Sequence, residues 1–183
     1  IGVFDGVHSG HEELISRMLT EGGARGLTGG IVTFHPSPVT VLRPDIELSY
    51  LTSLEQRVEL LRTAGVEFVS VIQFTSELAQ VSAREFVRLL VEETQMRLLV
   101  VGEDFALGRA REGNVEQLQV YGEELGFDVI PVPLLREADD HVSSTRVRGA
   151  LLTGDMTEVE ALLGRSYSVR GPVVHGDGRG RTI

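Results

Sequence analysis

Two histidines three residues apart, His8 and His11, are the side chains best placed in this sequence for chemistry on a phosphate. They lie in the stretch Gly2-Val3-Phe4-Asp5-Gly6-Val7-His8-Ser9-Gly10-His11, where we expect a strand to end at Phe4 and a helix to begin near Gly10. A helix start presents unpaired N–H groups and the positive end of the helix dipole, which suit a phosphate. Gly10 leaves room for that phosphate to approach the backbone. The histidine pair could stabilise charge on a pentavalent phosphorus without a covalent intermediate.

Two isolated histidines in such positions are more often a turn residue and a solvated helix residue. The combination of a strand, an Asp-Gly turn, the His-x-Gly-His pattern and a helix favours the phosphate site instead. A zinc site at His8 and His11 is disfavoured, because no third ligand stands nearby in the sequence. No metal-ligating residue is therefore predicted.

A second candidate group has the pattern Ser-Ser-Thr-x-x-Arg and comprises Ser143, Ser144, Thr145 and Arg148. Any one hydroxyl at a helix start ordinarily caps the helix. Three in succession exceed what capping needs, and Arg148, one turn further along, adds a forked cation. Together these side chains would offer hydrogen-bond donors and positive charge to a phosphate chain.

A third candidate is the loop Val101-Gly102-Glu103-Asp104-Phe105-Ala106-Leu107-Gly108, which is followed by Arg109 and Arg111. Asp104 could accept a hydrogen bond from a base or a sugar, or it could cap a turn. The two arginines could hold phosphate or belong to a solvated loop. The residues alone favour neither alternative.

Short β-branched runs alternate with amphipathic stretches, which predicts an α/β fold with a parallel sheet. The expected strands are Ile1–Phe4, Gly30–Phe34, Phe68–Phe74, Leu98–Gly102 and Phe127–Pro131. The expected helices between them are His11–Arg25, Leu54–Ala64, Ala83–Glu93 and Glu112–Leu125. Five strands with four crossovers give a five-stranded doubly wound sheet, whose ligands bind beyond the carboxyl ends of the strands. The candidate residues of the first and third groups follow such strand ends.

Composition narrows the possible functions. The chain has 183 residues, with 17 basic and 27 acidic side chains and a net charge of −10, which disfavours a nucleic-acid partner. No apolar run approaches the ~20 residues of a membrane span, and no signal peptide opens the chain, so we expect no membrane partner and a cytoplasmic location. Cysteine is absent, which excludes thiol chemistry. Every basic residue apart from histidine is arginine, so cationic contacts with a substrate would come from arginine.

The alternation of strands and helices ends after the fifth expected strand. Two short helices are expected, one after Ser143 and one capped by Asp155 that ends near Gly164. Beyond them a lone alternating strand, Tyr167–Val174, is followed by the turn-rich stretch Gly176–Gly180.

These motifs occur in a definite order along the chain. Gly-x-Phe-Asp-Gly-Val-His-x-Gly-His comes first, and then the segment Thr33–Pro38, Val-Gly-x-Asp-Phe-x-x-Gly, Ser-Ser-Thr-x-x-Arg and the run Leu162–Arg165. The His-x-Gly-His motif alone is typical of the wider nucleotidyltransferase superfamily. The ordered set resembles the bacterial bifunctional riboflavin kinase/FMN adenylyltransferases, also called FAD synthetases, over essentially the whole chain. The resemblance implies a Rossmann-like nucleotidyltransferase fold over residues 1–164. It also implies a short β tail at residues 165–183 that is the truncated start of a riboflavin kinase barrel.

The resemblance implies transfer of AMP from ATP to FMN, giving FAD and pyrophosphate, with Mg²⁺. ATP and FMN would then be the partners, and the kinase activity would need the rest of the parent protein. The implied catalytic residues are His8, His11 and Arg148. The implied nucleotide-binding residues are Gly2, Val3, Phe4, Asp5, Gly6, Gly10, Ser143, Ser144 and Thr145. The substrate-binding residues expected beside them are Thr33, Pro36, Ser37, Asp104 and Arg111.

The FMN phosphate is already a nucleophile at neutral pH, so the reaction needs alignment and charge neutralisation rather than a general base. In this acidic chain the positive charge would come from Arg148, Arg111, the histidines, a helix terminus and Mg²⁺. The chain departs from the family at Ser37, where His is common, and at His35, where an acid is common. Two alternatives stay open: a nucleotidyltransferase with another phosphate acceptor, and an inactive flavin- or nucleotide-binding module.

Overall fold

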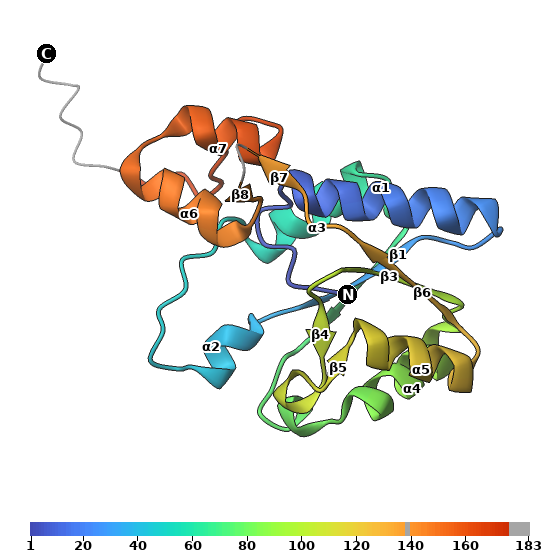
Figure 1. Cartoon of the computed structure of the whole chain (residues 1–183). Coiled ribbons are helices and arrows are strands. Elements are labelled where there is room, and N and C mark those ends of the chain that lie inside the picture. The colour runs from blue at the N-terminus through green and yellow to red at the C-terminus, as the bar shows by residue number, and fades with distance from the viewer. Residues whose placement is uncertain (138–139, 176–183) are drawn as a thin grey trace, which may run out of the picture.

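The computed structural model describes residues 1–137 and 140–175 and shows a mixed α/β fold (Figure 1). The helices are α1 (Ser9–Ala24), α2 (Pro38–Leu42), α3 (Leu54–Thr63), α4 (Ala83–Thr94), α5 (Val115–Leu125), α6 (Ser144–Thr153) and α7 (Met156–Leu163). The longer strands are β1 (Gly30–Phe34), β2 (Phe68–Ile72), β3 (Leu98–Gly102) and β6 (Asp128–Val132). The two-residue strands are β4 (Ala106–Leu107), β5 (Gly113–Asn114), β7 (Arg136–Glu137) and β8 (Asp140–His141).

The parallel sheet is present as two strand pairs. β1 pairs with β2, from Gly30 opposite Phe68 onward, and β3 pairs with β6, from Leu98 opposite Asp128 onward. The predicted parallel pairing is therefore confirmed, whereas a continuous five-stranded sheet is not. The opening segment 1–4 makes a single bridge, between Gly2 and Thr33, because Phe4 leaves the extended conformation with a φ of 53°.

Two of the three hydrophobic clusters hold the helices against the strand pairs. Ile15 of α1, Ile31 of β1 and Leu61 of α3 share one cluster. The other main cluster joins helices α4 and α5 to β3, through Val87, Leu118, Leu99 and Val101. Figure 1 shows α1 on one side of the strands and α4 with α5 on the other. This layering places the carboxyl ends of β3 and β6 next to the start of α1.

The helix boundaries follow the capping signals in the sequence. Ser53 and Gln56 form the reciprocal capping box expected at the start of α3, and the Ser82 hydroxyl accepts a hydrogen bond from the Glu85 N–H at the start of α4. The last two helices, α6 and α7, form the third hydrophobic cluster with Leu51. That cluster fixes the Ser-Ser-Thr turn beside the N-terminal segment.

The predicted strand Tyr167–Val174 is wrong: residues 165–175 have no helix or strand. A strand needs a neighbouring strand for its backbone hydrogen bonds, and no strand lies beside this segment in the described part of the chain. Instead, Tyr167 packs against the α6–α7 cluster and Arg170 forms an ion pair with Glu59 of α3. The expected turns at Gly176–Gly180 lie outside the described residues.

Candidate active site

A left-handed turn connects the opening segment to α1. Phe4, Gly6 and Val7 have φ values of 53°, 81° and 39°, which L-residues other than glycine rarely adopt. A Cβ on Gly6 would also lie 2.7 Å from a methyl carbon of Leu51. Phe4 and Val7 are buried in the cluster below the turn, so the core holds the backbone in this conformation. The turn brings the chain to His8 at the start of α1.

His8 and His11 lie together at the start of α1. The Nδ1 atom of His8 accepts a hydrogen bond from the His11 N–H at 3.3 Å, so His8 is the N-cap of the helix. A neutral His8 therefore carries its proton on Nε2. The two imidazole rings stack, with centroids 3.6 Å apart and planes inclined by 15°. The buried Nδ1 of His11 has no hydrogen-bond partner among the described residues.

Both imidazoles are neutral at pH 7. Burial, with a smaller contribution from the Arg165 guanidinium, lowers the pKa of His8 to about 4, although the Asp5 carboxylate opposes the shift. Burial, His8 and Arg57 lower the pKa of His11 well below its ordinary value. The expectation that the histidines supply positive charge is therefore wrong for the free protein, in which they are neutral hydrogen-bonding groups.

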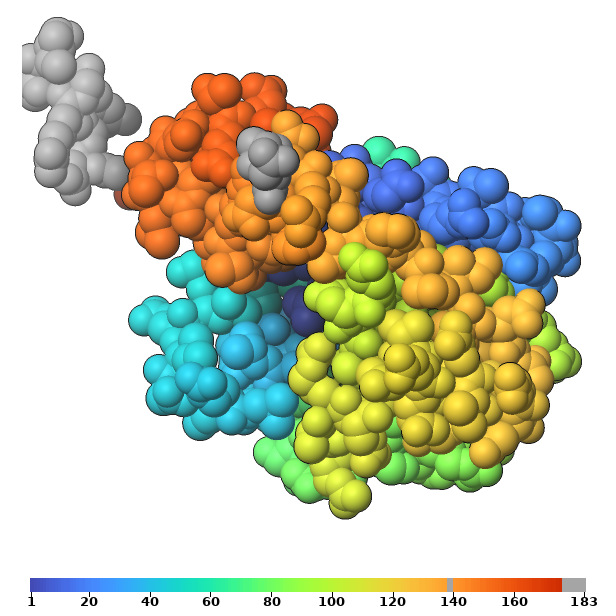
Figure 2. Space-filling view, in the orientation of Figure 1, coloured from blue at the N-terminus to red at the C-terminus, as the bar shows by residue number. Residues whose placement is uncertain are grey.

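The two imidazoles face a cavity of about 210 Å³. Its lining includes six of the predicted site residues: Gly2, Phe4, His8, Gly10, His11 and Asp104. The rest of the lining is largely apolar. Ile1, Leu14, Gly102 and Phe105 contribute part of it, and the end of β6 with the chain that follows contributes Val132, Pro133, Leu134, Leu135 and Val142. Figure 2 shows the first residues, in dark blue, at the bottom of a hollow between the cyan, orange and yellow-green segments.

Gly10 packs closely against the histidine pair. A Cβ built on Gly10 lies 3.3 Å from atoms of the His8 ring and 3.6 Å from the Val142 carbonyl oxygen. A side chain here would displace the imidazole or fill the approach to the helix N-terminus. The steric contact found at Gly10 is therefore with the His8 ring, and its expected role of leaving room for a phosphate stays a prediction.

Asp5, Ser144 and Arg148 also come together, but chiefly through contacts with one another. The Asp5 carboxylate is buried and accepts hydrogen bonds from the N–H groups of Leu51 and Thr52 and from Arg148. The Ser144 hydroxyl donates to the Asp5 carbonyl at 2.8 Å. Arg148 makes a further hydrogen bond to a backbone carbonyl, that of Ser49. None of these side chains lines the histidine cavity.

The other predicted site residues lie outside the lining of the histidine cavity. Ser143 caps α6, and Thr145 is exposed in the first turn of that helix. Arg111 donates to the backbone carbonyl of Asp104 at 3.1 Å, next to the cavity. Thr33 is fully buried and its hydroxyl donates to the Val3 carbonyl.

The expected substrate segment after β1 also lies outside the cavity lining. Ser37 is buried and its N–H donates to the Tyr50 hydroxyl, while Pro36 is half-buried. Gly6 lines a different cavity, against α3 and the segment that follows α7.

Sequence reasoning missed three features of the site. The chain after β6 contributes much of the cavity wall, and the strand-end rule could have identified it. Arg57 of α3 is fully buried, with its Nη2 atom 3.7 Å from Asp5, but in the sequence it is one more arginine on an amphipathic helix. Arg165 donates to the turn before His8 across more than 150 residues of sequence, and nothing local indicates that contact.

Two kinds of feature are absent from residues 1–137 and 140–175. No group of three or more histidine, aspartate or glutamate side chains there is arranged to hold a metal ion. In the same residues, no helix has both the length and the apolar character needed to cross a membrane.

Parallel strand pairs covered by helices, with a His-x-Gly-His helix start in a cavity at the strand ends, define a nucleotidyltransferase-type α/β domain. The family model described as FAD synthetase matches residues 1–146. The chain belongs to the FAD synthetase family.

Relatives support this assignment over the whole chain. Bifunctional riboflavin kinase/FMN adenylyltransferase of Escherichia coli (strain K12) is 38% identical and that of Listeria monocytogenes is 36% identical, each over 100% of this chain. The chain spans only 59% and 58% of their respective lengths. A crystal structure named macrolide-efflux protein from Streptococcus pneumoniae is also similar, with a TM-score of 0.89 and 34% identity. That similarity covers 100% of this chain and 59% of the other.

Proposed function

We propose that this domain is an FMN adenylyltransferase that transfers AMP from ATP to FMN, releasing FAD and pyrophosphate. The observation that carries the proposal is the stacked pair of neutral histidines, which lines a strand-end cavity at the N-terminus of α1. The relatives' names include this activity. They also include riboflavin kinase, which we assign to the part of the parent protein that lies beyond this chain.

In the proposed reaction an oxygen of the FMN phosphate attacks the α-phosphorus of ATP. The bond from that phosphorus to the bridging oxygen breaks, and pyrophosphate leaves with the electron pair. The nucleophile is already ionised at neutral pH, so no side chain has to remove a proton. The protein's task is to align two anions and to stabilise the charge that develops between them.

The start of α1 is the proposed phosphate site. His8 presents Nε2–H as a donor, because its Nδ1 is occupied by the His11 N–H. The helix terminus adds a positive dipole end, and Gly10 lets phosphate oxygens reach the backbone. The apolar wall at Phe105, Leu134 and Leu135 suits the adenosine part of ATP.

Arg148 and the Ser-Ser-Thr turn are proposed to hold the triphosphate from the side of α6. In the free protein the Arg148 guanidinium contacts Asp5, which lies three residues before His8. We propose that ATP draws part of this guanidinium toward phosphate, while Thr145 and Ser144 contribute hydroxyl donors. Asp5 then remains paired with the Leu51 and Thr52 backbone and with Arg57.

FMN is proposed to bind beside this site, next to Thr33, Pro36 and Ser37 on one side and Asp104 with Arg111 on the other. Mg²⁺ would enter with ATP, since this ion usually takes one or two carboxylates together with substrate phosphates. The Asp104 carboxylate fits that need, because Asp104 lines the cavity and its side chain is exposed. When bound, the ion would neutralise phosphate charge.

The finer features of the fold belong to the same proposal. We infer that the opening segment lies between the two strand pairs, as the middle of a five-stranded sheet. In support, Gly2 bridges Thr33 of β1, and Ile1 packs against the cluster that contains Leu99 and Val101 of β3. We assign residues 1–164 to the adenylyltransferase domain and 165–183 to the start of the kinase domain, and we expect a cytoplasmic enzyme.

The test is to incubate the purified chain with ATP, Mg²⁺ and FMN and to measure FAD by chromatography and pyrophosphate by a coupled assay. Equal amounts of the two products are expected. Parallel reactions with phosphopantetheine and glycerol phosphate as acceptors should release no pyrophosphate. Release with one of those acceptors and not with FMN would identify a different nucleotidyltransferase. Binding of both ATP and FMN without any product would identify an inactive binding module.

A further inference from the structure

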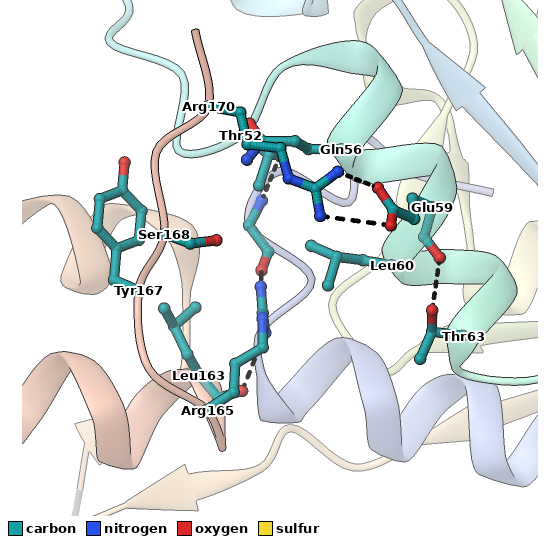
Figure 3. Close-up of a pocket in the computed structure, with 11 residues that line it drawn as sticks. Thr52, Gln56, Glu59, Leu60, Thr63, Leu163, Arg165, Tyr167, Ser168 and Arg170 are labelled. Carbon is teal, nitrogen blue, oxygen red and sulfur yellow. Dashed lines mark hydrogen bonds and ion pairs between the residues drawn. The ribbon is translucent and has the colours of Figure 1, made fainter.

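Arg165, just after the end of α7, makes a contact that the proposed chemistry does not use. Its side chain reaches back to the left-handed turn before α1 (Figure 3). Nη2 donates to the Gly6 carbonyl, and Nη1 donates to the carbonyls of Val7 at 2.8 Å and Leu163 at 3.1 Å. One guanidinium thus binds two successive carbonyls of the turn and the carbonyl of Leu163, the last residue of α7.

The bonded carbonyls lie on either side of the most unusual backbone position in the turn. Val7 is β-branched and has a φ of 39°, a region where such residues are rare. A conformation of this kind persists only where surrounding contacts hold it. The Val7 carbonyl belongs to the peptide that enters His8, so a change in its direction would move the residue that caps α1 and stacks on His11.

Arg165 is itself held in place by the segment that it begins. Tyr167 anchors the segment by packing against the α6–α7 cluster, whereas the ion pair of Arg170 with Glu59 of α3 is exposed and contributes little. A cavity of about 240 Å³ lies between this segment and α3, and Gly6 and Arg165 both line it. Figure 3 shows the segment running past α3 with Arg165 at its start.

We propose that Arg165 is a positioning residue for the adenylyl transfer. Its guanidinium group fixes the Gly6–Val7 turn, so that His8 and His11 keep their stacked arrangement in the cavity. The segment leaving α7 is thereby connected to the phosphate site, and a displacement of that segment changes the turn. The kinetic part of this inference rests on the proposed function, whereas the positioning can be measured without turnover.

The experiment compares three variants of the 183-residue chain: Arg165→Ala, Arg165→Lys and the matched control Arg170→Ala. Arg170 lies on the same segment but pairs only with an exposed glutamate, Glu59. Imidazole ¹⁵N–¹H spectra of His8 and His11 are recorded over a pH series. The kcat and the KM for ATP are then measured with saturating FMN, and thermal unfolding reports whether each variant is folded.

For Arg165→Ala we expect shifted imidazole resonances and a kcat lowered about tenfold or more, since small displacements of catalytic groups have effects of this size. The KM for ATP should change less than kcat does. The pKa of His8 should rise, because one nearby cation is lost while Asp5, Arg148 and His11 remain. Arg165→Lys keeps the positive charge and hence the low pKa of His8. A lysine ammonium cannot donate to the Gly6 and Val7 carbonyls with the two-pronged geometry of a guanidinium, so the kcat of this variant should lie between those of Arg165→Ala and the parent chain. Arg170→Ala should resemble the parent chain in every measurement.

Two results would overturn the proposal. One is a folded Arg165→Ala whose imidazole spectrum and kcat match those of Arg170→Ala. The other is complete recovery of kcat and spectrum in Arg165→Lys, which would reduce the role of Arg165 to its charge. If Arg165→Ala does not fold, the proposal is judged by Arg165→Lys: a kcat and an imidazole spectrum equal to those of the parent chain would overturn it, and a lowered kcat with shifted resonances would support it. If the parent chain shows no adenylyl transfer, the proposed function fails, while the imidazole spectra still accept or reject the positioning.

Discussion

Two polar clusters lie within a few residues of each other at the start of this chain, and they differ in how completely they are bonded. The Asp5 carboxylate accepts hydrogen bonds from Leu51, Thr52 and Arg148. The imidazoles of His8 and His11 have one internal hydrogen bond between the two residues and face a cavity. Because buried polar groups are almost always paired, the contrast distinguishes a carboxylate that the fold already occupies from imidazoles that remain available to a ligand. The neighbouring Arg57 is not fully bonded either, since its Nε and Nη2 atoms have no hydrogen-bond partner among the described residues.

The two clusters also differ in net charge. The Asp5 cluster holds one carboxylate next to two guanidinium groups, those of Arg57 and Arg148, and therefore keeps a net positive charge. The histidine pair is neutral in the free protein. The positive charge of this part of the molecule thus lies in arginines beside the cavity, while the imidazoles that line the cavity are neutral hydrogen-bonding groups.

The largest effect is expected from Asp5→Ala, which removes the buried carboxylate. The variant leaves Arg57 and Arg148 without their counter-charge in a buried setting, so the free energy of unfolding should fall by about 3–5 kcal/mol. Urea unfolding followed by circular dichroism measures the change. Asp45→Ala is the matched control, because Asp45 forms an exposed pair with Arg43 and its loss should change the free energy by less than ~0.5 kcal/mol. Equal stabilities for the two variants would show that Asp5 is not the structural centre assigned to it.

This difference between the clusters could not be predicted from the sequence. Asp5 and His8 are both polar residues at one expected strand end, and both were assigned to the nucleotide. The partners that distinguish them are distant: Leu51 is 46 residues from Asp5, and Arg148 is 143 residues away. Residue type and local spacing predict where a site lies, but they do not determine which of its polar groups the fold already occupies.

The fold was predictable where periodicity is strong. Strands Gly30–Phe34 and Leu98–Gly102 have the predicted boundaries, and α3 and α4 begin at the predicted capping residues. The two-residue hairpins β4–β5 and β7–β8 were missed, because two residues are too short for an alternating pattern. The segment after α7 has a strand-like pattern, but the described part of the chain offers it no partner strand.

The histidine pair gives the second largest expected effect. His8→Asn keeps an N-cap for α1, since asparagine caps well, but removes Nε2–H from the cavity. Its kcat for FAD formation should fall about 10²-fold, as for loss of a donor to the transition state, with a change in unfolding free energy below ~1 kcal/mol. His11→Ala should show a similar fall. His175→Ala, in the exposed segment after α7, is the control and should keep the parent rate. Parent rates in both His8 and His11 variants would assign the pair to structure instead.

Gly10→Ala changes the space beside the His8 ring and leaves the polar groups of the site as they are. The added methyl lies 3.3 Å from the His8 ring, so the ring must shift or the phosphate must bind further out. We expect about tenfold weaker ATP binding by calorimetry, a difference of about 1.4 kcal/mol, with a folded protein. Gly149→Ala in α6 is the matched control, since a Cβ there meets nothing within 4 Å. That control should raise the unfolding free energy by ~0.5–1 kcal/mol, as alanine favours a helix over glycine, and leave ATP binding unchanged.

The smallest expected effect is a pH dependence of the free energy of unfolding, which tests whether the imidazoles are neutral in the folded protein. Burial lowers the pKa of His8 to about 4, from an ordinary value near 6.5, so between these values the unfolded chain binds more protons than the folded one. Through His8 alone, stability should therefore fall by about 1 kcal/mol between pH 7 and pH 5.5, where carboxylates hardly titrate. The lowered pKa values of His11 and of the N-terminal amine add to this fall in the same direction. His8→Asn should reduce this slope and His175→Ala should not. The opposite sign, with stability rising toward pH 5.5, would mean that His8 is protonated in the folded protein and that the positive charge lies at the cavity itself.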